Sequence, residues 1–152
     1  MSDGIFMEAA IPLEPVLKLA RQRRMSQKKV YQWLLECAER ALVEWEQEWP
    51  QFTGVREAYE WCRDNPFKTN PAWHTGARNP ATVDYFACPN VDPEFIAMAM
   101  SDLYEDFCVP RDAEECWNSA YNIAYNFQQV KDETKYHEEE TWQAVRLLRY
   151  LK

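Results

Sequence analysis

The chain has 152 residues, of which 47% are hydrophobic, and this is enough to bury the core of one ordinary domain without disulfides or a metal ion. Its formal net charge of -8 repels phosphate and makes the molecule as a whole a poor non-specific binder of nucleic acid. No apolar run reaches the roughly 20 residues of a membrane span, and no basic segment followed by an apolar one predicts a secretory signal.

The first predicted elements are an apolar arm and two helices. Residues 1–11 form the arm, in which Ile, Phe, Met and Ala predominate. A short helix follows and runs to about Arg24, with Pro15 in its first turn, where proline is well tolerated. Ser26 is a good N-cap for the next helix, in which apolar residues recur at steps of three and four as far as Trp49.

The middle of the chain is predicted to hold one short helix and a long connection. Thr53 is expected to cap the helix, which ends before Asn65-Pro66. Residues 65–91 contain four prolines that interrupt any helical pattern, so they form the connection. Within it, the β-branched and aromatic residues near 82–86 indicate a short strand.

Three more helices complete the predicted fold. Asp92, followed by proline and glutamate, is a strong signal for the start of the first. Asp112, with a glutamate three residues later, resembles a capping box and begins the second, and the third spans about Thr134 to Leu151. The sequence therefore predicts an all-α fold, an irregular bundle of about six helices in a single domain over residues 1–152.

The sequence contains no motif that indicates a reaction. His137 precedes three glutamates, but a zinc protease motif needs a second histidine four residues later, where this chain has Thr141. The five cysteines are irregularly spaced, with no Cys-x-x-Cys pair, and there is no glycine-rich phosphate loop. We expect no catalytic residue, no metal and no cofactor, and the odd number of cysteines favours reduced thiols in the cytoplasm.

The charges of the long helix are reversed with respect to its dipole. Lys28 and Lys29 lie at its positive end, whereas Glu44, Glu46 and Glu48 lie at its negative end. Either a neighbouring element compensates these charges, or the three glutamates face an external partner.

A row of amides is the second feature that needs an explanation. Asn118, Asn122 and Asn126 recur every four residues, and Tyr121 and Tyr125 lie beside them. Asparagine is a mediocre helix former, so three on one side of a helix indicate a role. The row is either a buried hydrogen-bonded ladder or an exposed polar strip for contact with a partner.

These features favour a non-enzymatic module that binds a protein partner with a basic surface. An inhibitor of the kind found in phages or mobile elements, which blocks the nucleic-acid-binding face of its partner, is one form of this hypothesis. The alternatives are an enzyme or ligand-binding protein with a pocket under residues 65–91, and a nucleic-acid binder through the basic segment 18–29. A homodimer is compatible with all of them. The residues proposed for the pocket are Trp73, His74, Arg78, Asp84 and Tyr85.

Overall fold

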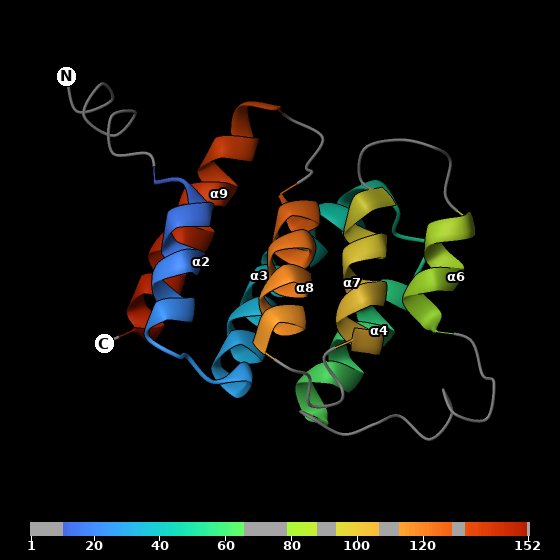
Figure 1. Ribbon diagram of the computed structural model, residues 1–152. Coiled ribbons are helices and arrows are strands. Elements are labelled where there is room, and N and C mark those ends of the chain that lie inside the picture. The colour runs from blue at the N-terminus through green and yellow to red at the C-terminus, as the bar shows by residue number, and fades with distance from the viewer. Residues whose placement is uncertain (1–10, 66–78, 88–93, 107–112, 129–132, 152) are drawn as a thin grey trace.

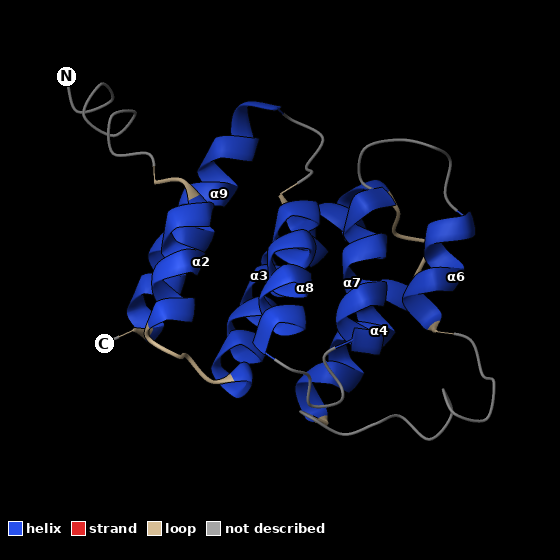
Figure 2. Ribbon diagram, viewed as in Figure 1, coloured by secondary structure: helices blue, strands red, loops and turns tan. Residues whose placement is uncertain are grey.

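The computed structural model describes residues 11–65, 79–87, 94–106, 113–128 and 133–151, and these contain seven helices and no strand (Figures 1 and 2). The all-α fold expected from the sequence is therefore confirmed. The helices are α2 (Leu13–Gln22), α3 (Gln27–Glu48), α4 (Gly54–Asp64), α6 (Pro80–Ala87), α7 (Glu94–Asp106), α8 (Ala113–Phe127) and α9 (Glu133–Tyr150). The arm predicted over residues 1–11 falls almost entirely outside the described residues.

Helix α3 is the centre of the bundle. It contacts α4, α7, α8 and α9, and Figure 1 shows it behind α8. Its N-terminus is capped as expected, since the Ser26 hydroxyl accepts a hydrogen bond from the Lys29 backbone at 3.2 Å. Trp33 and Trp45 of its apolar stripe are fully buried, and each donates an indole hydrogen bond to a backbone carbonyl. Such bonds let large aromatic rings enter a core without leaving a polar atom unpaired.

The remaining helices form two groups on either side of α3. Helices α4, α6 and α7 pack on one another, and α2 packs on α9 and α8 (Figure 1). Helix α2 ends in a tight turn, in which the Met25 backbone bonds to the Ala20 carbonyl and the Arg24 backbone to that of Arg21. This turn places Arg24 at a φ of 55°, a left-handed conformation that glycine usually occupies.

The strand predicted near 82–86 is wrong, because these residues lie within helix α6. The Asn79 side chain accepts a hydrogen bond from the backbone of Ala81 at 3.0 Å, and Pro80 occupies the first helical position. Cap and proline together are a start signal that the sequence displays, but the surrounding prolines favoured an uninterrupted loop. Residues 65–91 are accordingly divided by a helix.

Two helices are capped by carboxylates from distant parts of the chain. The Glu140 carboxylate of α9 accepts a hydrogen bond from the Leu13 backbone at the start of α2, at 3.0 Å. The Asp84 carboxylate of α6 does the same for Val55 at the start of α4, at 2.8 Å. Thr53 was expected to cap α4, and its side chain makes no capping bond because its backbone is already helical, with a φ of -97° and a ψ of -1°. Both caps also tie neighbouring helices together.

Candidate functional site

Helix α8 presents a repeated pair of side chains along one side. An aromatic residue followed directly by asparagine occurs three times at four-residue intervals, and we call this set the aromatic–amide row: Trp117, Asn118, Tyr121, Asn122, Tyr125 and Asn126. Asn118, Tyr121, Asn122 and Tyr125 are exposed, Asn126 is half-buried, and Trp117 is buried. The amides therefore form an exposed strip for most of their length, not a buried ladder.

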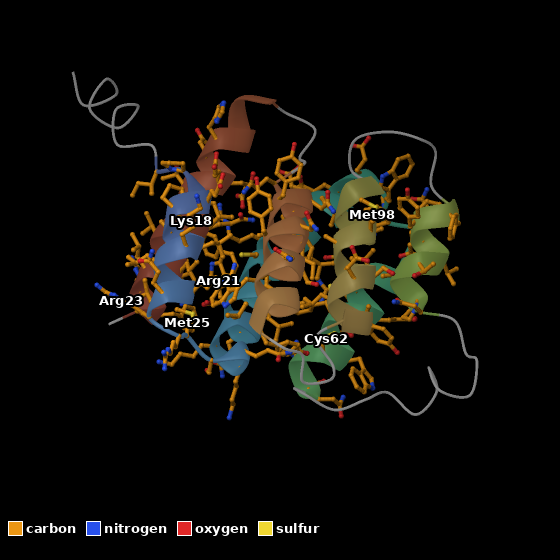
Figure 3. The ribbon with its side chains drawn as sticks, viewed as in Figure 1. Lys18, Arg21, Arg23, Met25, Cys62 and Met98 are labelled. Atoms are coloured by element: carbon orange, nitrogen blue, oxygen red, sulfur yellow. The ribbon has the colours of Figure 1, made fainter. Side chains whose placement is uncertain are left out.

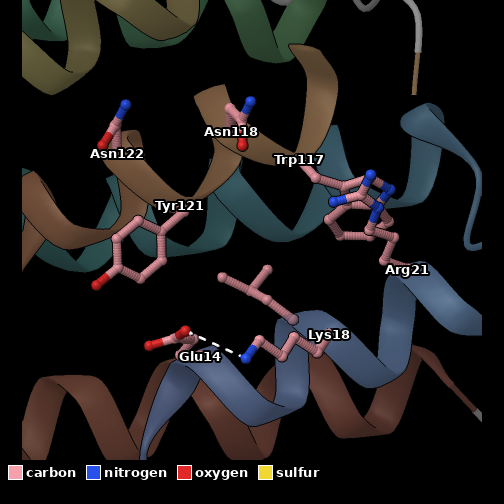
Figure 4. Close-up of a pocket in the computed structure, with 8 residues that line it drawn as sticks. Glu14, Lys18, Arg21, Trp117, Asn118, Tyr121 and Asn122 are labelled. Atoms are coloured by element: carbon pink, nitrogen blue, oxygen red, sulfur yellow. Dashed lines mark ion pairs between the residues drawn. The ribbon is translucent and has the colours of Figure 1, made fainter. Parts of the chain in front are cut away.

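The first two pairs of the row, Trp117 with Asn118 and Tyr121 with Asn122, form one wall of a groove between α8 and α2. The groove has a volume of about 560 Å³, and Leu17, Lys18 and Arg21 of α2 line it opposite the row. Figure 4 shows Arg21 on the side of Trp117, whereas Glu14 lies on the side of Tyr121. A cavity of this size accommodates several side chains or a small ligand.

The groove offers hydrogen-bond donors that the protein itself does not use. Within the described residues, Arg21 has no acidic partner, and the amides of Asn118 and Asn122 have no hydrogen bond. Lys18 lies 3.4 Å from Glu14, but both side chains are largely exposed, so this pair contributes about 0–0.5 kcal/mol. The groove is thus suited to an occupant that accepts hydrogen bonds and has a negative charge near Arg21.

Tyr121 lines the groove, and Tyr125 lies beside it one turn further along α8. Their rings stack with centroids 6.3 Å apart and planes tilted by 28°. They are 40% and 43% exposed, whereas most other aromatic rings of the described residues are buried or half-buried. Exposed, preorganised aromatic rings are common anchors of protein interfaces.

The three glutamates at the end of α3 are partly compensated. Two Glu46 oxygens accept hydrogen bonds from Arg56 of α4, at 2.5 and 2.6 Å, and these bonds lower the pKa of Glu46. Arg56 also lies 3.5 Å from Glu60. The neighbouring element expected as one explanation therefore exists for Glu46. Glu44 and Glu48 are half-buried on the same turns of α3, which has no basic residue in its last turn.

The pocket predicted under residues 65–91 receives no support from its described members. Asp84 is buried and bonded to the start of α4, and burial, which outweighs its backbone hydrogen bonds, raises the pKa of its carboxyl group. Tyr85 is half-buried, with its ring against that of Phe86. Trp73, His74 and Arg78 lie outside the described residues. Asp84 is a structural residue, not part of an open site.

The basic segment 18–29 is divided between different surfaces. Lys18 and Arg21 line the groove, and Arg23 lines a second cavity beside α9 (Figure 3). Lys28 and Lys29 are exposed at the start of α3. Binding of nucleic acid through this segment stays a prediction, and its first two cations contribute to the groove.

The described residues offer no reactive cysteine and no group of metal ligands. Cys37 and Cys62 are buried free thiols, and burial, together with the charges of Glu139 and Glu36, raises the pKa of the Cys37 thiol well above its usual value. In the described part of the chain, no three His, Cys, Asp or Glu side chains are grouped as ligands for a metal ion. No described helix is both long enough and apolar enough to cross a membrane.

No family model, curated protein or solved structure matches the chain. The sequence indicated the amide positions and the two tyrosines of this site. It did not indicate the opposite wall on α2, which joins the site only through tertiary packing. The repeat of aromatic–asparagine pairs was a visible signal that would have added Trp117.

Proposed function

We propose that the protein is a non-enzymatic module that binds a protein partner in the groove between α2 and α8. The exposed aromatic–amide row is the observation that supports this function. Its asparagines weaken the helix by about 0.5 kcal/mol each relative to alanine, and they make no compensating bond within the described residues. Its tyrosines are exposed beside a cavity that is already formed. A partner that covers the row would hydrogen-bond to the asparagines and pack on the tyrosines.

The acidic end of α3 supports a second contact, with a basic surface of the partner. Glu44 and Glu48 flank Glu46 in the last turns of α3, and these three carboxylates concentrate negative charge at one end of a molecule with a net charge of -8. Such a surface would accelerate encounter with a basic partner. If the partner is a nucleic-acid-binding protein, this acidic contact would cover its basic surface and inhibit it. The cytoplasm is the expected compartment, since five irregularly spaced cysteines favour reduced thiols.

Site-specific photo-cross-linking tests the proposed function. A photo-reactive phenylalanine analogue in place of Tyr125 should cross-link a specific protein in the cells that produce this chain. The same analogue in place of Phe86 is the matched control, because Phe86 is 79% exposed but lies on α6, outside the groove and the acidic end of α3. Cross-links to nucleic acid, or identical products from both positions, would contradict a protein-binding groove.

The partner recovered in this way also tests the acidic contact. The double variant Glu44→Lys with Glu48→Lys should reduce the affinity and flatten its dependence on salt. Glu46 is left unchanged so that its ion pair with Arg56 continues to join α3 to α4. An unchanged affinity and salt dependence would remove this end of α3 from the interface, but would leave the groove in place.

A further inference from the structure

We propose that the groove holds an extended segment of the partner, with an acidic side chain beside Arg21 and every second residue in register with one aromatic–amide pair of α8. This inference rests on the proposed protein-binding function and specifies the conformation and charge of the ligand.

The spacing of the row matches an extended chain. Four residues of an α-helix rise by about 6 Å. Two residues of an extended chain advance by about 6.4–6.8 Å. The difference accumulates to about 1–1.5 Å over the two steps that separate the three pairs, which side-chain rotation can absorb. An extended segment of about five residues would therefore meet the pairs beginning at Trp117, Tyr121 and Tyr125 with alternate residues.

The chemistry of asparagine favours an extended ligand over a helical one. A primary amide presents both donors and an acceptor, so it pairs with the N–H and C=O groups of a peptide backbone. An extended segment leaves these backbone groups open along its side, whereas a helix satisfies them internally. The exposed amides of Asn118 and Asn122 would be of little use against a helix, which buries an apolar stripe instead.

The charges in the groove determine the kind of chain. Arg21 has no acidic partner among the described residues and lies beside Trp117, so it is placed to bind a carboxylate of the ligand. Single-stranded nucleic acid also stacks on aromatic rings at similar intervals. A phosphate at every nucleotide, however, would meet Glu14 in the groove and the net charge of -8. A peptide with one acidic residue fits these charges better.

Selection from a displayed library of random dodecapeptides tests the inference. The folded full-length chain should enrich peptides that share an acidic residue. In synthetic peptides of the enriched sequence, each backbone amide is N-methylated in turn. Methylation should weaken binding about five- to tenfold at alternate positions over the bound stretch, because only alternate N–H groups of an extended chain face α8.

Paired variants locate the peptide on the protein. Arg21→Ala should weaken binding of the selected peptides about tenfold or more, and Asn122→Ala about fivefold. Lys29→Ala and Gln32→Ala are the controls, because they remove an exposed cation and an exposed amide of α3 outside the groove, and affinity should be unchanged. Loss of the acidic residue from the peptide should abolish the effect of Arg21→Ala.

The alternative results separate the inference from the proposed function. Groove-dependent peptides without an alternating N-methyl pattern would overturn the extended ligand but retain a protein-binding groove. Failure to enrich any peptide, with a protein still cross-linked through position 125, would also overturn the extended ligand alone. A further possible result is tight binding of oligothymidine that is lost in Arg21→Ala and Asn122→Ala. That result would overturn both the extended peptide ligand and the protein-binding function in favour of nucleic-acid recognition. Peptides that bind all four variants equally would show that the groove is not their site and would overturn the inference.

Discussion

The Asp84 carboxylate accepts a hydrogen bond from the Val55 backbone at 2.8 Å, and through it helix α6 caps the first turn of α4. Gly54 has no side chain, and an added Cβ would lie 2.8 Å from an Asp84 oxygen and in steric conflict with the Pro80 carbonyl. The close approach of α6 to α4 therefore requires glycine at position 54 and an acceptor at position 84.

Asp84→Ala should lower the free energy of unfolding by about 1–3 kcal/mol, because it leaves the buried Val55 N–H of α4 without an acceptor. Thr53→Ala should change it by less than about 0.5 kcal/mol, although Thr53 occupies the usual capping position. Urea denaturation of both variants measures the difference. Equal costs would mean that Thr53 shares the capping role in solution.

The contrast between α3 and α4 shows which parts of the fold were predictable. The bounds of α3 follow from its own stripe and from Ser26, which lie in one continuous segment, and they were predicted closely. The first backbone N–H groups of α2 and α4 donate to Glu140 and Asp84, which are remote in sequence, so no local pattern could indicate these caps. The groove was likewise predictable only in part. The sequence showed the row on α8, but the wall on α2 joins it only through packing of two helices that are remote in sequence.

A buried amide pair joins the last two helices. Gln128 donates to the Gln143 side chain at 2.7 Å, and the Gln143 amide donates to the Ala124 carbonyl at 3.0 Å. Both glutamines are almost completely buried. Gln143→Leu should lower the free energy of unfolding by about 1–3 kcal/mol, since it leaves the Gln128 amide without an acceptor. The double variant with Gln128→Leu should lose at least about 0.5 kcal/mol less than the sum of the single variants. Strictly additive losses in urea denaturation would exclude this coupling.

The pH dependence of stability should include a contribution from Glu36. Burial opposes ionisation of this carboxyl group, but hydrogen bonds from Arg146 and Tyr150 outweigh it, so the pKa of Glu36 is lowered in the folded state. A lowered folded pKa means that the contribution is complete above the unfolded value of about 4.3 and is lost as the pH falls through the folded value. Glu36→Gln should therefore cost most near neutral pH and least in acid.

Urea denaturation across this pH range, compared with Glu138→Gln, measures the effect of Glu36. Glu138 is an exposed carboxylate of α9 outside this hydrogen-bond group. The comparison must be between variants, because the raised pKa of Asp84 has the opposite sign and favours the folded state as the pH falls. A cost of Glu36→Gln that is constant with pH would contradict the lowered pKa.

The amides of the aromatic–amide row should separate binding from stability. Asn118→Ala and Asn122→Ala should each raise the free energy of unfolding by about 0.5 kcal/mol, because alanine is the better helix former and neither amide has a hydrogen bond among the described residues. Asn79→Ala is the contrasting variant, since its buried amide donates to Ser101 at 3.1 and 3.2 Å, and it should lose about 1–3 kcal/mol. Thermal and urea denaturation of the three variants would measure these shifts. A loss of stability in Asn118→Ala or Asn122→Ala would assign that residue to the fold. A gain, together with weaker binding in the groove, would mean that the chain retains a less stable helix because its partner needs these amides.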